Sequence, residues 1–212
     1  MTEADAREAD AFPREGGPAG VDDDSVEYDA TISMTAANLI AIGLLPLFVA
    51  TLLLPYLGLW GVAALGAGFR SVARLQVLIP LFAALVVIHE LLHATGFLLF
   101  AKVGRKDIRF GVNWRALSPY AHCKAAVGAR AYKWAVALPG LVLGVLPNAI
   151  GLVTGSGWLL LWGFFMVIAS AGDIAILWAI RRVPAVAVLR DHPSRAGCQV
   201  LRARSVAGVA DL

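Results

Sequence analysis

Long apolar runs, separated by short polar stretches, dominate the middle of this chain. Residues 35–69 contain no charged side chain, residues 75–101 contain only Glu90, and residues 134–172 contain none. A helix that crosses the hydrocarbon core of a bilayer needs about 20 apolar residues. The pattern therefore predicts membrane-spanning helices, and each run is long enough for at least one.

The third run predicts two spans, because its 39 residues are too many for one helix. A turn signal, Thr154-Gly155-Ser156-Gly157, interrupts it near the middle. The predicted spans are residues 38–60, 75–101, 134–153 and 158–180. The predicted fold is an all-α membrane protein with about four transmembrane helices.

A different period appears between the second and third spans. Residues 107–115 alternate, with Ile108, Phe110, Val112 and Trp114 on one face. Alternation of this kind predicts a strand with its apolar face against the membrane domain, as part of a small cytosolic β-hairpin. An edge strand there could hold an extended peptide by main-chain pairing. The alternative is a short structural hairpin, and the sequence favours neither.

Composition supports the membrane class and separates the ends from the middle. The chain is 59% hydrophobic and 16% charged, with a mean hydropathy of +0.73, whereas a soluble domain is about half apolar and a quarter charged. The first 30 residues carry ten acidic side chains against two arginines, which is typical of disorder. We expect a disordered acidic tail over residues 1–33, a membrane-embedded domain over 34–182 and a cytosolic C-terminal tail over 183–212.

The basic residues predict the orientation. After residue 30 the chain has sixteen Lys or Arg, of which fourteen lie in residues 102–133 or after the fourth span, and only Arg70 and Arg74 lie on the other side. By the positive-inside rule the protein is a multi-pass cell-membrane protein with both termini cytoplasmic. Basic flanks of spans reflect this orientation rather than nucleic-acid binding, so we expect membrane lipid and no nucleic acid as a partner. Cys123 and Cys198 then face a reducing compartment and are expected to be free thiols.

The chemistry is concentrated in HELLH, residues 89–93, inside the second apolar run. On a helix His89 and His93 lie one turn apart on the same face, so both imidazoles can bind one zinc ion. Glu90 lies beside them, where a carboxylate can take a proton from a zinc-activated water. The alternative is a pair of packing histidines with a carboxylate partner. An acid at mid-membrane costs about 2.5–3.5 kcal/mol on insertion scales, and this cost favours the zinc site.

A zinc site needs a third protein ligand, and Glu90 is the last glutamate in the chain. Leu99 stands where the extended HExxHxxGxxH pattern would have a third histidine. The remaining downstream candidates are Asp107, His122, Asp173, Asp191, His192 and Asp211. Asp173 is favoured because it alone lies within a predicted span, about 12 Å below the same membrane edge as His93. Its small neighbours and Gly96 would let the two helices approach closely. The alternative for Asp173 is pairing with an arginine or lining a water cavity.

Several motifs of the sequence together resemble those of a known family. HELLHATGF on a helix, the basic loop, the Ala171-Gly172-Asp173 segment in a span and the trailing DHPSRAG are similar to membrane proteins described as putative zincin peptidases. These proteins resemble, in plan, the site-two proteases, which cut peptide bonds within the membrane. The resemblance covers about residues 75–197 and implies His89, His93 and Asp173 as zinc ligands and Glu90 as the base. The chain departs from the Leu-Asp-Gly arrangement of site-two proteases at Ala171-Gly172-Asp173.

The predicted function is a zinc-dependent intramembrane or juxtamembrane peptidase acting on a membrane protein or peptide. Two other classes stay open: a metal-binding protein without hydrolytic activity, and a structural protein whose His-Glu-His cluster only joins helices. Glu90 favours hydrolysis, since zinc binding alone needs no carboxylate at that position.

Overall fold

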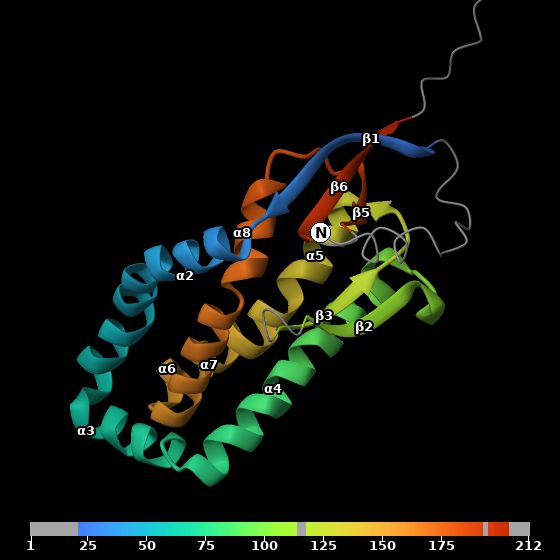
Figure 1. Cartoon of the computed structure of the whole chain (residues 1–212). Coiled ribbons are helices and arrows are strands. Elements are labelled where there is room, and N and C mark those ends of the chain that lie inside the picture. The colour runs from blue at the N-terminus through green and yellow to red at the C-terminus, as the bar shows by residue number, and fades with distance from the viewer. Residues whose placement is uncertain (1–20, 114–117, 193–194, 204–212) are drawn as a thin grey trace, which may run out of the picture.

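The computed structural model describes residues 21–113, 118–192 and 195–203, and it is mostly helical (Figure 1). The helices are α2 (Met34–Phe48), α3 (Leu54–Val72), α4 (Leu75–Gly96), α5 (Ala129–Pro139), α6 (Leu146–Thr154), α7 (Gly157–Ala169) and α8 (Ala171–Ala179). Short π-helical segments continue three of them: Val49–Leu53 joins α2 to α3, Phe97–Ala101 extends α4, and Gly140–Val145 joins α5 to α6.

Three continuous helical segments among the described residues are long and apolar enough to cross a membrane. They are Thr35–Val72, Gln76–Ala101 and Ala129–Thr154. Helices α7 and α8 pass the same test together, as a pair bent by 46° at Ser170. Each predicted span thus corresponds to an apolar helix or helix pair. Four crossings remain a prediction, because they require the bent pair to count as one span.

The first long helix changes direction at Gly61, whose φ of +74° is not helical. Only glycine adopts such a backbone conformation without strain. Beyond Gly61, α3 runs across the end of the bundle toward α4 (Figure 1). The predicted end of the first span, at residue 60, therefore coincides with this kink. Tyr56 and Trp60 fix the helix before it, because their side chains donate to the carbonyls of Gly155 (2.6 Å) and Leu152 (2.9 Å).

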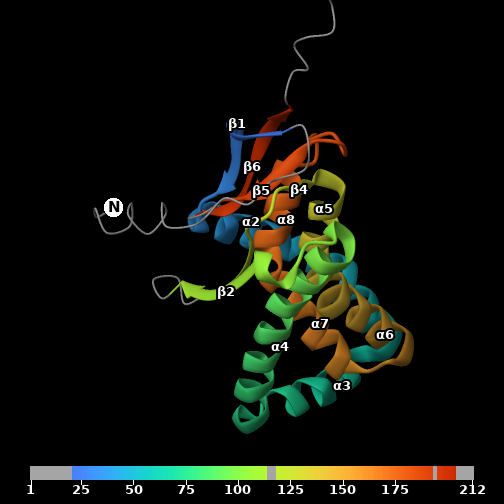
Figure 2. The same ribbon diagram turned by 90° about the vertical axis from the view of Figure 1, so that its right-hand side faces the viewer.

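A four-stranded antiparallel sheet covers the opposite end of the bundle, so the all-α prediction was incomplete. Its order is β1–β6–β5–β4, with β1 at Val21–Ile32, β4 at Val127–Gly128, β5 at Val188–Asp191 and β6 at Ala196–Ala203. Two strands therefore come from the segment expected to be a C-terminal tail. The sheet lies over the ends of α5 and α8 in both ribbon views (Figures 1 and 2).

Strand β1 lies within the segment that composition predicted to be disordered, and for Val21–Ile32 that expectation is wrong. In its second half Glu27 and Asp29 alternate with Val26, Tyr28 and Ala30, and its backbone pairs with β6. A strand needs partners for its backbone groups rather than a low charge. Composition averages over this alternation and says nothing about the distant partner. Residues 1–20 lie outside the described part of the chain.

The hairpin between α4 and α5 was predicted, and its strands are β2 (Ile108–Asn113) and β3 (Ser118–Cys123). It projects sideways from the bundle (Figure 2). Its apolar face does not pack as expected: Ile108 is partly buried against the core, but Phe110 and Val112 are 51% and 44% exposed. Trp114 lies outside the described residues. The hairpin contacts the bundle through β3, which packs on α4.

Candidate metal centre

Helix α4 presents His89 and His93 on one face, one turn apart, as the spacing predicts. Their ring centroids are 4.9 Å apart, with the ring planes at 78°. No polar residue lies between Gln76 and His89, so the helix up to this point is suited to lipid. The imidazoles therefore have to find partners within the protein, and the structure supplies an acid.

That acid is Asp173, in the first turn of α8, directly after the bend at Ser170. Its Oδ2 lies 3.2 Å from His89 Nε2 and its Oδ1 lies 3.3 Å from His93 Nε2. The first turn of a helix favours a carboxylate, because unpaired backbone N–H groups there carry partial positive charge. The bend between α7 and α8 creates this helix start inside the bundle, where a straight helix would have none.

The three side chains form a group that could hold a metal ion, with ligand atoms all within 4.8 Å of one another. Around a tetrahedral zinc with bonds of about 2.0 Å, donor atoms lie about 3.3 Å apart, close to the two His–Asp distances. Asp173 Oδ2 is buried, and its 3.2 Å contact with His89 Nε2 does not have the geometry of a hydrogen bond. The three side chains are only 12%, 12% and 16% exposed. The donor types, their spacing and this incompletely satisfied carboxylate fit zinc.

The carbonyl of Ala135, on α5, fixes the tautomer of His93. His93 Nδ1 lies 3.1 Å from this oxygen, and a carbonyl can only accept, so Nδ1 carries the proton. In the neutral imidazole that binds a metal, Nε2, which lies 3.3 Å from Asp173 Oδ1, is then the coordinating nitrogen. Gly96 makes this contact possible, because a Cβ there would lie 2.6 Å from Ala135 Cα. We expected Gly96 to face the Asp173 helix; it faces α5 instead, and a Cβ at Gly172 would meet nothing within 4 Å.

Glu90 lies beside the histidines and contacts the hairpin. The backbone N–H of Ala121, in β3, donates a hydrogen bond to its carboxylate. The Glu90 side chain of α4 is thus held by β3, a strand about 30 residues later in the chain. A carboxylate accepts up to four hydrogen bonds, so this contact leaves it able to accept a proton.

Two other candidates for the third ligand, His122 and Asp191, form a separate group under the sheet. Asp191 Oδ2 accepts from the N–H of Cys123 (2.7 Å), and Oδ1 accepts from the hydroxyl of Tyr132 (2.6 Å). His122 Nδ1 lies 3.7 Å from Asp191 Oδ2. Burial raises the pKa of Asp191 above its usual value, although His122 and the Cys123 N–H act in the opposite direction. Burial also lowers the pKa of His122.

The remaining candidates lie elsewhere. Asp107 accepts from the backbone N–H of Gly104 (2.8 Å), and His192 Nε2 lies 3.7 Å from Asp29 in β1. Asp211 is outside the described residues. Asn148, a possible oxyanion donor by residue type, is 2% exposed and gives its amide to Gly144 O at 2.9 Å. Of the six downstream candidates, the structure brings only Asp173 to the histidines in the described part of the chain.

Sequence reasoning missed the two backbone groups at this centre, the Ala135 carbonyl and the Ala121 N–H. Every residue has such groups, so residue type gives no signal for them. Gly96 was a partial signal: its place on the histidine face indicates a close helix, without saying which one.

Residues 82–188, half of the chain, match the model of a protein family described as "Putative zincin peptidase". Comparison with curated proteins and with solved structures gave no match.

Proposed function

Because this chain belongs to the family described as "Putative zincin peptidase", we propose that it is a zinc-dependent peptidase that cuts substrates within or next to the membrane. His89, His93 and Asp173 hold the zinc ion, and Glu90 is the general base. The observation that carries the proposal is the meeting of an acid from α8 with two histidines from α4, at 3.2 and 3.3 Å.

Each protein group has a separate task in this proposal. When bound, zinc lowers the pKa of a water molecule to about 7 and polarises the substrate carbonyl. Glu90 accepts the proton of the attacking water and passes it to the leaving amine. Ala135 holds His93 in the tautomer whose Nε2 can bind the metal, and Ala121 holds the carboxylate of Glu90.

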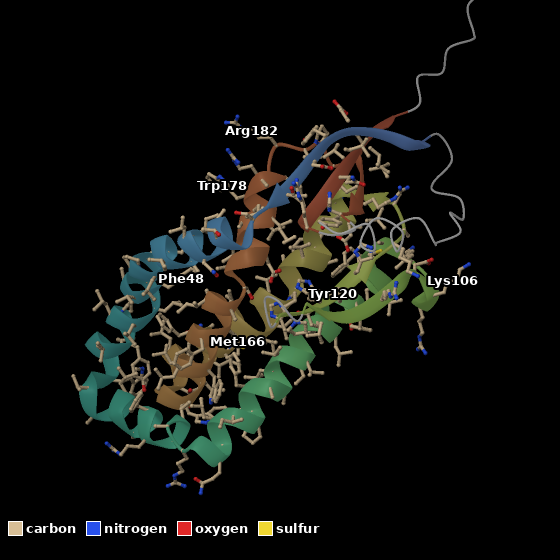
Figure 3. The ribbon with its side chains drawn as sticks, viewed as in Figure 1. Phe48, Lys106, Tyr120, Met166, Trp178 and Arg182 are labelled. Carbon is tan, nitrogen blue, oxygen red and sulfur yellow. The ribbon has the colours of Figure 1, made fainter. Side chains whose placement is uncertain are left out.

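The depth of the centre supports action within or at the edge of the bilayer. The α4 helix continues eight residues beyond His93, to Ala101, which is about 12 Å at 1.5 Å per residue. The basic residues Lys106 and Arg182 lie at this end of the molecule (Figure 3). By the positive-inside rule this end faces the cytoplasm. The substrate is then a membrane protein or peptide that reaches the centre from the lipid or from that face.

On the hairpin edge nearest the centre, the backbone N–H groups of β3 already donate to side chains of the protein. Ala121 and Cys123 are two residues apart in β3, so their N–H groups point to the same edge. They donate to Glu90 and Asp191, and Pro119, two residues earlier, has no N–H. An extended substrate along this edge would find no free backbone N–H at these three positions.

Glu90→Gln tests the proposal against metal binding without hydrolysis. An amide cannot take a proton from water, and loss of a general base typically lowers the rate by about 10² to 10⁴-fold. We expect the variant to retain zinc and to lose cleavage of a membrane-peptide library by the purified, zinc-loaded protein. Glu27→Gln, the same change at an exposed position of β1, should cut like the wild type. A Glu90→Gln variant that cuts normally would exclude Glu90 as the base.

A further inference from the structure

Asp191 connects strand β5 with β3 and α5, the two elements whose backbone contacts Glu90 and His93 at the candidate metal centre. It ends strand β5, and its side chain is 12% exposed. One carboxylate oxygen accepts from the N–H of Cys123 in β3 and the other accepts from the hydroxyl of Tyr132 in α5. Its position is fixed by β6, where Asp191 pairs with Cys198 and His192 N–H donates to Gly197 O at 3.0 Å.

The edge of β3 that Asp191 contacts is also the edge that contacts Glu90. The N–H of Cys123 donates to Asp191, and two residues earlier the N–H of Ala121 donates to Glu90. Two neighbouring N–H groups on one edge thus hold two carboxylates, one under the sheet and one at the centre. The backbone of β3 from Ala121 to Cys123 thus joins the Glu90 carboxylate to the Asp191 carboxylate.

We propose that Asp191 is a positioning residue for Glu90, an inference that rests on the proposed function. Asp191 fixes the end of β3, and β3 in turn places the Ala121 N–H against the Glu90 carboxylate. The hairpin projects from the bundle (Figure 2). If Asp191 no longer binds the Cys123 N–H, the Ala121 N–H bond to Glu90 is the remaining one of the two N–H bonds on this edge of β3. The C-terminal segment 188–203 therefore serves the metal centre, although the family match ends at residue 188.

The chemistry of the contact requires a carboxylate. Cys123 N–H and Tyr132 O–H are both donors in this arrangement, and they reach different oxygens of Asp191. A carboxylate accepts at both oxygens, whereas an amide has one accepting oxygen and one donating nitrogen. Asp191→Asn therefore keeps the volume of the side chain and removes at least one of the two bonds. A base that moves by about 1 Å can lose about a hundredfold in rate.

The test compares Asp191→Asn with Asp29→Asn in the full-length, zinc-loaded protein. Asp29 is an acid of the same sheet whose described partners, Gln199 at 3.1 Å and His192 at 3.7 Å, lie outside β3. Three quantities are measured: deuterium uptake of the β3 amides, zinc per chain, and kcat and KM for a cleaved peptide. For Asp191→Asn we expect β3 exchange faster by about tenfold or more, kcat lower by about ten- to a hundredfold, and zinc and KM within about twofold of the wild type. Asp29→Asn should change none of them.

The outcomes separate this inference from the proposed function. Unchanged exchange in β3, or a loss of kcat that merely follows a loss of zinc, overturns the positioning role. A wild type that cuts no peptide overturns the proposed function, while the exchange measurement still decides whether Asp191 holds β3. If Asp191→Asn yields no folded protein, Asp191→Glu answers the same question, because it keeps the charge and moves the carboxylate by one methylene group relative to the Cys123 N–H. An Asp191→Glu variant with unchanged β3 exchange and unchanged kcat would then overturn the inference.

Discussion

His93 and Ala135 join the metal-binding helix to its neighbour: Nδ1 of the imidazole donates to the Ala135 carbonyl at 3.1 Å. The contact exists because Gly96, one turn further along α4, lets the backbones of α4 and α5 approach. One imidazole nitrogen thereby fixes the helix pair and leaves the other for Asp173. At His93, therefore, the packing of α4 against α5 and the geometry of the candidate metal ligands depend on the same side chain.

Gly96→Ala should therefore weaken both stability and zinc binding. Its Cβ would lie 2.6 Å from Ala135 Cα, so α4 would have to move away from α5. Overpacking of this kind typically costs about 1–3 kcal/mol. Gly172→Ala is the matched control, because a Cβ there meets nothing within 4 Å although Asp173 is adjacent. Thermal unfolding and zinc affinity of both variants check this, and a Gly96→Ala protein that equals Gly172→Ala in both would refute the packing argument.

Asp173→Ala should weaken zinc binding far more than His122→Ala or Asp191→Ala. Loss of a group that only orients a metal ligand costs about 10- to 100-fold in affinity, so loss of a ligand should exceed about a hundredfold. His122 and Asp191 contact each other and lie in a separate group. Competition titrations with a chelator of known zinc affinity give the three values. The opposite order would move the third ligand to the group under the sheet.

The two thiols should be unreactive in the folded protein. Burial, and then the carboxylate of Asp191, raise the pKa of both Cys123 and Cys198 to about 12. Both side chains are buried and neither forms a disulfide. At pH 8, four pH units lower, about one thiol in ten thousand is a thiolate, the form that reacts. Iodoacetamide at pH 8 should label neither cysteine before unfolding and both afterwards, as read by mass spectrometry. Rapid labelling of the native protein would contradict the buried sheet–bundle interface.

Topology reporters test the four crossings and the orientation. Fusions after residues 20 and 204 should both report the cytoplasm, because fourteen of the sixteen basic residues after residue 30 lie on that side. A fusion near Gly155, in the turn between α6 and α7, should report the other side. A cytoplasmic signal at Gly155 would show that α5 with α6, or α7 with α8, does not cross.

The sequence predicted the apolar helices and the residues of the centre because both have local signals. Uninterrupted apolar runs predict long helices, and the His89–His93 spacing predicts a shared face whatever the rest of the fold. Asp173 followed from its depth in an apolar run, where an acid is costly. These inferences need only one segment at a time.

The sheet and the second carboxylate group depended on distant partners that no single segment reveals. Strand β1 pairs with β6 across about 170 residues, and Asp191 reaches Cys123 across 68. Asp191 has no such local signal, because it stands in a short polar stretch and its partners are far away in the chain. Its carboxylate lies under a sheet that the prediction did not contain.

Metal analysis of the purified protein tests the central claim most directly. Wild-type protein, reconstituted with zinc and freed of excess metal, should carry one zinc per chain, because three donor groups meet at one place. His93→Ala removes the ligand whose tautomer Ala135 fixes, and it should carry far less than one while remaining folded by circular dichroism. If the wild type carries well under one zinc per chain, or if His93→Ala carries as much as the wild type, His89, His93 and Asp173 are not a zinc site.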